Sequence, residues 1–211
     1  ATVVYRLKKG YFVSTSIKTN SWYMYKKHYW IKDDSGTSLR NTLSEEIRML
    51  YMEKARDMRN KANQVKTPEG ELDIESEKYK LLYAKADILL NISMKLANTH
   101  DKNNIMQECR ELFYDKDFEK TLDQDRYLLC CENGVIDFRN KTFRKGTPED
   151  YLSKCTKINF REIDEKKDAP MMKEISDYMS KLFPIPELCE YAWNHLASIL
   201  IGDTAKTQCL H

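Results

Sequence analysis

The feature that most constrains this fold is a change in the spacing of its apolar residues near residue 39. From there, apolar side chains recur mostly at steps of three and four residues, the period of an amphipathic helix; they are Leu39, Leu43, Ile47, Leu50, Tyr51, Met58 and Ala62. A turn-forming sequence at residues 67–70 interrupts the pattern. A second stripe then follows, formed by Tyr79, Leu82, Tyr83, Ala86, Leu90, Met94 and Ala97. The two segments predict an antiparallel helical hairpin, and residues 105–113 predict a third helix.

The residues before this pattern have the composition of β-strands. Their aromatic and β-branched side chains fall in three short runs, at residues 11–13, 22–25 and 29–32. A basic triplet at residues 26–28 separates the last two runs, and a polar sequence at residues 33–36 closes the block as a turn. The pattern predicts a small antiparallel meander, and residues 2–8 are compatible with a short helix.

Residues 127–144 predict a second β element. An apolar run is followed by Asn133 and Gly134, a pair typical of tight turns, and then by a second apolar run. The segment at residues 146–167 has no regular period, although residues 158–163 could add another strand.

The chain is expected to continue into two helices. The first begins near Pro170 and stops before Pro184, while the second begins at Pro186 and has Gly202 as its C-terminal cap. The side chains expected on the buried side of the second helix are Leu188, Ala192, Leu196, Ile199 and Leu200. The fold class is therefore α+β, predominantly helical, with a small N-terminal antiparallel sheet and a second short β-hairpin element. The expected regions are a β meander at 1–36, a helical body at 37–167, and C-terminal helices at 168–211.

Composition argues against two classes of protein. Hydrophobic residues make up 41% of the 211 and charged residues 32%, which is ordinary for a soluble globular chain and unlike a disordered one. No apolar run approaches the roughly 20 residues of a transmembrane helix, and the first residues lack the layout of a signal peptide. The six cysteines show no CxxC spacing, so we expect reduced thiols in an intracellular protein.

No catalytic or metal-binding residue can be assigned from the sequence. The six glycines do not form a GxxxxGK[ST] phosphate loop, and a zincin helix, a nucleophile elbow and a dinucleotide fingerprint are also missing. Cys209 and His211 have no second pair of ligands. Glu132 and Asp137 flank the predicted tight turn, where acid–base chemistry and a structural role are both open. The lack of a neighbouring histidine, lysine or metal motif favours the structural role.

Positive charge is concentrated at one end of the chain. Residues 1–32 contain seven lysines and arginines and no acid, although the whole chain has a net charge of only +2. Single-stranded nucleic acid is bound by stacking bases on aromatic rings while cations neutralise phosphates. The candidate DNA-binding residues are Trp22, Tyr23, Tyr25, Lys26, Lys27, His28 and Trp30. The alternative is that the rings fill the core of the sheet, since only one face can be exposed.

Several segments occur in an order that resembles a known family. They are Trp22-Tyr23, His28-Tyr29-Trp30, Leu39-Arg40 with Leu43-Ser44, Leu122-Asp123, the run from Glu132 to Asp137, and Phe143-Arg144 with residues 148–151. Together they resemble the poxvirus-type primase-helicases of nucleocytoplasmic large DNA viruses, in the domain immediately preceding the superfamily 3 helicase module. The resemblance covers nearly the whole chain. Cys130 and Cys131 depart from it, since relatives tend to carry a glycine or aromatic residue before the turn.

The resemblance implies a role for the parent protein and a smaller one for this chain. The parent would be a hexameric, ATP- and Mg²⁺-dependent DNA helicase with a primase, acting on single-stranded or forked DNA in the host-cell cytoplasm and not at a membrane. The family's ATP-site residues have no counterpart in this sequence, so the chain itself is expected to be non-catalytic and to hold no cofactor or metal. It would connect the primase and the motor.

Two functions for the chain remain open. It could aid DNA engagement and hexamer assembly, or it could be a pure oligomerisation and linker domain without DNA binding. A ring interface could use the apolar faces of the terminal helices, although packing within the domain would also explain them; the residues concerned are Met172, Ile175, Met179, Leu196 and Ile199. An independent enzyme is disfavoured because no nucleophile, metal site or phosphate loop is present.

Overall fold

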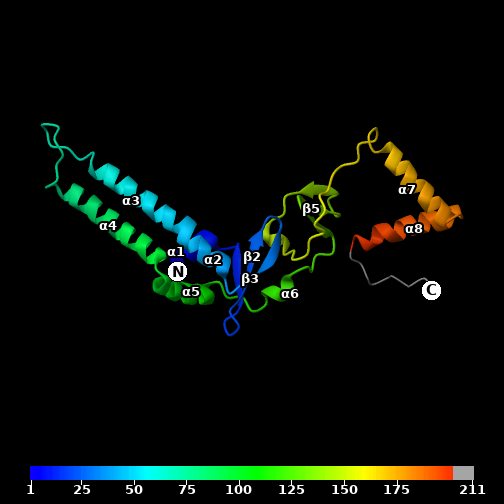
Figure 1. Cartoon of the computed structure of the whole chain (residues 1–211), viewed down its shortest axis with the longest axis horizontal. Helices are drawn as coiled ribbons and strands as arrows, with labels where there is room; N and C mark the ends of the chain where they lie inside the picture. The colour runs from blue at the N-terminus through cyan, green and yellow to red at the C-terminus, as the bar shows by residue number, and fades with distance from the viewer. Residues whose placement is uncertain (202–211) are drawn as a thin grey trace. The chain divides into compact units, whose positions relative to one another are not determined.

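The computed structural model describes residues 1–201, and the chain divides into two units (Figure 1). The first unit contains residues 1–24 and 32–118. The second contains residues 25–31 together with the chain from Glu119 onward, so it takes in the tip of a hairpin from the N-terminal region. The predicted cap Gly202, and Cys209 and His211, lie outside the described residues.

A short helix and three strands open the chain. They are α1 (Thr2–Lys8), β1 (Phe12–Ser16), β2 (Ser21–Lys26) and β3 (Tyr29–Asp34), and the sheet order is β1-β2-β3. β1 and β2 are antiparallel, with Val13 opposite Tyr23. The predicted meander and the short helix before it are both confirmed.

A helical hairpin makes up most of the first unit. Its elements are α2 (Thr37–Thr42), the π-helical turn η1 (Leu43–Ile47), α3 (Arg48–Ala62), α4 (Glu77–Ala97) and α5 (Thr99–Leu112). α3 and α4 lie side by side and run in opposite directions (Figure 1). The Ser76 hydroxyl caps α4 by accepting from the Tyr79 amide at 3.2 Å, and Asn98 Oδ1 caps α5 by accepting from the His100 amide at 2.8 Å. The predicted hairpin and third helix are confirmed.

The core of the first unit joins the sheet to these helices. Its buried apolar residues are Val4, Phe12, Trp22, Leu39, Leu43, Ile47, Leu96, Met106, Cys109 and Phe113. Gly36 begins α2 with a φ of +68°, and a Cβ at this position would lie 3.1 Å from the Trp22 ring. The Asp33 carboxylate accepts from the Ser38 amide at 3.1 Å and from its hydroxyl at 2.9 Å. The turn after β3 therefore sets the start of α2.

The second unit is built on another three-stranded antiparallel sheet. Its strands are β4 (Leu128–Cys131), β5 (Gly134–Asp137) and β6 (Thr142–Arg144), and the short helix α6 (Phe118–Thr121) precedes them in the chain. Cys130 pairs with Val135, and Ile136 pairs with Phe143. Cys130 and Val135 are buried together with Leu152. The second β element and the α+β class are thus confirmed.

The segment after β6 is irregular apart from the single turn η2 (Pro148–Asp150). The possible strand at residues 158–163 is wrong. The Glu132 amide donates to the Ile158 carbonyl at 3.0 Å, but the next partners of this segment come from a side chain. Asn133 Nδ2 donates to the Phe160 carbonyl at 2.8 Å, and Asn133 Oδ1 accepts from the Phe160 amide at 2.9 Å. An asparagine side chain therefore replaces the backbone ladder of a strand.

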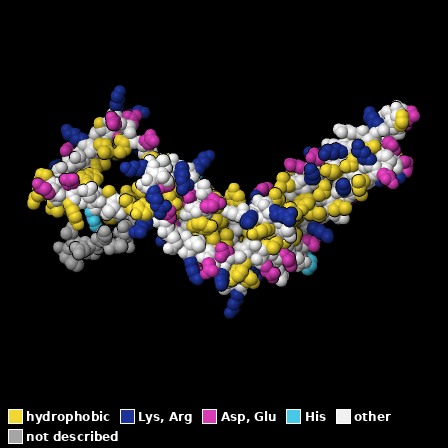
Figure 2. Space-filling model, turned by 180° about the vertical axis from the view of Figure 1, so that it is seen from behind, with side chains coloured by type: hydrophobic (Ala, Val, Ile, Leu, Met, Phe, Trp, Pro, Cys, Tyr) yellow, Lys and Arg dark blue, Asp and Glu magenta, His cyan; other side chains and the backbone are white. Residues whose placement is uncertain are grey.

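Two helices follow, α7 (Ala169–Leu182) and α8 (Pro186–Ile199), and both begin as predicted. The prediction of a buried side on α8 is wrong, because Leu196 is 47% exposed and Ile199 is 59% exposed. Met179 is the one apolar side chain of the two helices that is buried. Two helices packed together leave much of their apolar surface uncovered, and Figure 2 shows hydrophobic side chains gathered along this pair. Among the described residues, no helix is both long and apolar enough to cross a membrane.

Candidate nucleic-acid interface

The basic turn at the tip of the β2–β3 hairpin is defined by Lys26, Lys27 and His28. β2 ends at Lys26 and β3 begins at Tyr29, so Lys27 and His28 form a two-residue turn. Lys27 has a φ of +59°, as tight hairpin turns require of at least one central residue. Lys26 and Lys27 are exposed, and His28 is half-buried. The turn lies in the second unit.

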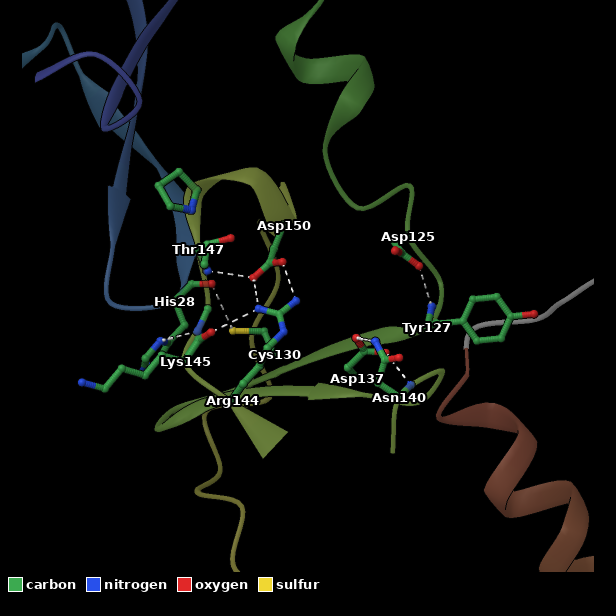
Figure 3. A network of polar contacts seen from close by, with 12 residues as sticks. His28, Asp125, Tyr127, Cys130, Asp137, Asn140, Arg144, Lys145, Thr147 and Asp150 are labelled. Carbon is green, nitrogen blue, oxygen red and sulfur yellow. Dashed lines mark hydrogen bonds and ion pairs between the residues drawn. The ribbon is translucent and has the colours of Figure 1, made fainter. Parts of the chain in front are cut away.

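Three hydrogen-bonding groups of the second unit fix this turn. His28 Nδ1 accepts from the Gly146 amide at 3.1 Å (Figure 3). A Cβ on Gly146 would lie 2.9 Å from the His28 carbonyl oxygen, so only glycine allows this approach. The Trp30 amide donates to the Leu152 carbonyl at 2.6 Å, and its indole Nε1 donates to the Pro148 carbonyl at 2.9 Å. The basic turn is therefore held on both sides.

Glu132 is the acid that faces the basic turn. Its carboxylate forms an ion pair and a hydrogen bond with the Lys27 ammonium. That hydrogen bond, followed by the charges of Lys27, His28 and Lys157, lowers the pKa of Glu132, and the same contact raises the pKa of Lys27. Both groups are charged at neutral pH. The positive charge around Glu132 exceeds what one carboxylate can neutralise.

A frame of ion pairs and turn contacts supports the segment behind the basic turn (Figure 3). Arg144 donates to both oxygens of Asp150, at 2.8 and 2.7 Å, and the Thr147 amide donates to Asp150 at 2.7 Å. Burial opposes ionisation of Asp150, but the bonds from Arg144 and Thr147 outweigh it and lower its pKa. The Asp137 carboxylate accepts from Asn140 Nδ2 at 2.8 Å, which lowers the pKa of Asp137. These carboxylates hold turns, in agreement with the structural role favoured for Asp137.

The chain is similar to a known domain over most of its length. The family described as D5 N terminal like matches residues 1–181. The chain belongs to this family. Three viral proteins, each named "Putative helicase", are similar to this D5 N-terminal-like domain. Protein L207/L206 of Acanthamoeba polyphaga mimivirus is 32% identical over 198 residues, covering 94% of this chain.

The other two relatives come from iridescent and frog viruses. Protein 022R of Frog virus 3 (isolate Goorha) is 31% identical over 71% of the chain, and 121R of Invertebrate iridescent virus 3 is 33% identical over 58% of it. The chain spans 20%, 18% and 13% of the lengths of the three relatives. The resemblance to helicases of large DNA viruses is thereby confirmed for the D5 N-terminal-like domain.

The structure of this domain places the predicted aromatic residues mainly in packed positions. Trp22 is 0% exposed and Trp30 is 2% exposed, so neither ring offers a face to solvent. The half-buried Tyr23 ring lies 5.6 Å from Phe118, and the Tyr25 ring lies 5.6 Å from Trp30. Lys26, Lys27 and His28 are brought together at the turn. The packed rings are not brought into one stacking platform.

Two further cations of the D5 N-terminal-like domain belong to this surface and were not singled out from the sequence. Lys145 is exposed and lies beside His28, with its side chain extending away from the polar frame (Figure 3). Lys157 is exposed and near enough to lower the pKa of Glu132. The basic composition of residues 139–157 was the available signal, but only the fold shows which of these cations lie near the turn. Among the described residues, no cluster of histidine, cysteine or acidic side chains could hold a metal ion.

Proposed function

We propose that this D5 N-terminal-like domain serves a viral replicative helicase by contacting single-stranded or forked DNA through the basic turn. The observation that carries the proposal is the exposed pair Lys26 and Lys27 on a fixed hairpin tip, with Lys145 and Lys157 next to it. Ammonium groups held at a turn can neutralise neighbouring phosphates without first ordering a loop. The names of the viral relatives support the assignment to a helicase.

The physical form of this contact follows from the placement of the rings. Trp22 and Trp30 are buried, so the basic turn offers charge rather than stacking. Binding through phosphates is sequence-independent and weakens steeply with salt. The turn is therefore suited to hold a strand while another part of the protein moves it.

The test is a fluorescence anisotropy titration of labelled single- and double-stranded oligonucleotides at low and moderate salt. The variant Lys26→Ala with Lys27→Ala should weaken binding and reduce the slope of log Kd against log salt on single strands by at least about 0.7, because Lys26 has no carboxylate partner among the described residues and each lost phosphate contact removes about 0.7. A matched control is Lys78→Ala with Lys85→Ala, which removes the same charge from exposed positions on α4. Equal binding by the two double variants would contradict the proposal.

In the parent protein, this domain would precede an ATP-driven motor that uses Mg²⁺ and acts as a ring on forked DNA in the host-cell cytoplasm. The ATP and Mg²⁺ sites would lie outside this sequence. A linking position agrees with the small share of each relative that the chain covers. The primase of the parent would be a separate domain.

A second candidate function is oligomerisation or linkage without DNA binding. It is favoured by the exposed apolar surface of α7 and α8, which encloses a cleft of about 380 Å³; lining side chains include Tyr178, Met179, Leu182, Phe183, Leu188 and Leu196. Sedimentation velocity at low and high salt tests it. Two results together would favour this function over the first. The chain would assemble to the same extent at low and high salt and lose that assembly in Leu188→Glu, and the wild-type chain would not bind DNA.

A further inference from the structure

A second basic and aromatic surface lies in the first unit and is lined by residues that the sequence pattern did not single out. A cleft of about 300 Å³ lies between the α1–β1 turn and the end of α5. Tyr5, Lys9 and Gly10 line it on one side, and Tyr114 and Asp115 line it on the other. No step of the proposed function uses this cleft.

The α5 side of the cleft is fixed by two backbone hydrogen bonds to β1. The Ser14 amide donates to the Phe113 carbonyl, and the Asp115 amide donates to the Ser14 carbonyl, each at 2.9 Å. Tyr114 lies between these bonds, at an isolated bridge to Ser14. Phe113 is buried, whereas Tyr114 is 44% exposed. Unlike Tyr23 and Tyr25, Tyr114 packs on no aromatic ring within the described part of the chain.

The α1 side of the cleft is equally well defined. The Lys9 amide donates to the Tyr5 carbonyl at 2.7 Å, and the Tyr11 amide donates to the Lys8 carbonyl at 3.0 Å. Gly10 lies between them with a φ of +87°, and a Cβ added there would meet no atom within 4 Å. The Lys9 ammonium is 5.9 Å from the centre of the Tyr5 ring. Space for a flat ligand therefore exists beside an exposed cation.

The charge around the cleft favours an anionic ligand. The Lys8 ammonium is neutralised by Glu46 at 2.6 Å. Arg6 and Lys9 are exposed, and neither has a carboxylate partner among the described residues. Asp115 is the acid that lines the cleft, and its Oδ1 already accepts from the Asp117 amide at 3.0 Å.

We propose that this cleft binds one unpaired base of single-stranded DNA, stacked on Tyr114, with the adjoining phosphate on Lys9. A tyrosine ring and a base offer matching flat surfaces, and stacking of this kind tolerates any base. A base in a duplex is covered on both faces, so the cleft selects single strands. The inference rests on the proposed DNA contact and adds to it a site in the first unit that provides the stacking absent from the basic turn.

The experiment measures binding of a fluorescent oligothymidylate to the full chain and to four variants. Tyr114→Ala should raise the Kd about tenfold, in the range found for loss of one stacked base. Tyr114→Phe keeps the ring and should bind like the wild type. Lys9→Ala should reduce the salt slope by about 0.7. The matched control Tyr83→Ala removes an exposed tyrosine from α4 and should leave the Kd unchanged.

A second readout locates the base directly. Oligothymidylate carrying 5-iodouracil is irradiated with the wild-type chain, and the cross-linked peptide is identified by mass spectrometry. Tyr114 should carry the cross-link in the wild type, and Tyr114→Ala should lose it while retaining the wild-type melting temperature. A cross-link at another residue, with Tyr114 unmodified, would overturn the site.

The outcomes separate this inference from the proposed function. If Tyr114→Ala and Lys9→Ala bind like the wild type while the Lys26→Ala, Lys27→Ala variant binds weakly, the cleft is overturned and the basic turn stands. If the turn variant binds normally and Tyr114→Ala does not, the cleft stands alone. Absence of binding by the wild type at low salt overturns both.

Discussion

Arg144 and Asp150 form a two-bonded ion pair six residues apart, with guanidinium nitrogens 2.8 and 2.7 Å from the two carboxylate oxygens. The pair closes the loop that carries Gly146, whose amide bonds His28. The side chain of Asp150 is 8% exposed, whereas that of Arg144 is 36% exposed. The ion pair thus connects the stability of the second unit to the position of the basic turn.

Loss of the Arg144 side of this ion pair should destabilise the second unit. Arg144→Gln leaves the buried carboxylate of Asp150 without its main partner, and the free energy of unfolding should fall by about 1–3 kcal/mol. Urea unfolding followed by circular dichroism measures the change. Arg56→Gln is a suitable control, because Arg56 is exposed on α3 and has no carboxylate partner among the described residues. Equal losses for the two variants would show that the ion pair adds nothing.

The same ion pair should make the free energy of unfolding depend on pH in the acidic range. The pKa of Asp150 is lower in the folded chain than the usual value of about 3.9 for an unfolded aspartate. The stabilisation is therefore present above about pH 4 and is lost as the pH falls through the lower, folded pKa. The difference in unfolding free energy between the wild type and Asp150→Asn should be largest at neutral pH and shrink toward pH 2. A difference that grows on acidification would contradict this sign.

Gly36 should resist substitution more strongly than Gly10. Both have positive φ, but a Cβ on Gly36 would lie 2.9 Å from the Met106 methyl and 3.1 Å from Trp22, whereas one on Gly10 would meet no atom. Gly10→Ala should cost about 1 kcal/mol through its backbone conformation alone, and Gly36→Ala should cost about 2–3 kcal/mol because the clash is added. Thermal unfolding of the two variants provides the comparison. Equal melting temperatures for Gly36→Ala and Gly10→Ala would show that the side chains around Gly36 shift to accommodate the added Cβ.

The buried thiols should be unreactive in the folded chain. Burial raises the pKa of Cys109 to about 11 and that of Cys130 to about 12, so both remain protonated thiols at pH 8. Cys155 and Cys189 are half-exposed. Iodoacetamide should modify these two first, and peptide mass spectrometry can follow each site. Labelling in urea is the control, where all six cysteines of the chain should react. Equal rates for Cys109, Cys130, Cys155 and Cys189 without urea would refute the buried placement.

The arrangement of helices and strands was predictable because local chemistry determines it. Apolar steps of three and four residues located α3 and α4, and Pro170 and Pro186 marked the starts of α7 and α8. What covers a helix face was not predictable, since periodicity shows which residues share a face and not what packs there. The exposure of Leu196 could not be predicted for that reason.

The candidate site was predictable at the turn and not beyond it. Lys26 and Lys27 lie between two strand-like runs, so their exposure follows from the hairpin itself. Whether a neighbouring ring faces solvent depends on which side of the sheet the helices cover. Tyr114 is about ninety residues from the basic triplet in sequence. Its bridge to Ser14 joins two distant segments of the chain, which no local pattern reveals.

The burial of Trp22 and Trp30 predicts how tryptophan fluorescence responds to quencher and to DNA. These two rings are 0% and 2% exposed, whereas Trp193 on α8 is 43% exposed. Iodide should therefore quench mainly Trp193, and Trp193→Phe should leave a blue-shifted emission that iodide barely reduces. Oligothymidylate should also leave that emission nearly unchanged, because bases that stack on Tyr114 do not reach the two buried rings. Strong quenching of the Trp193→Phe variant by DNA would instead mean that the hairpin opens on binding and exposes Trp22 or Trp30 as stacking surfaces.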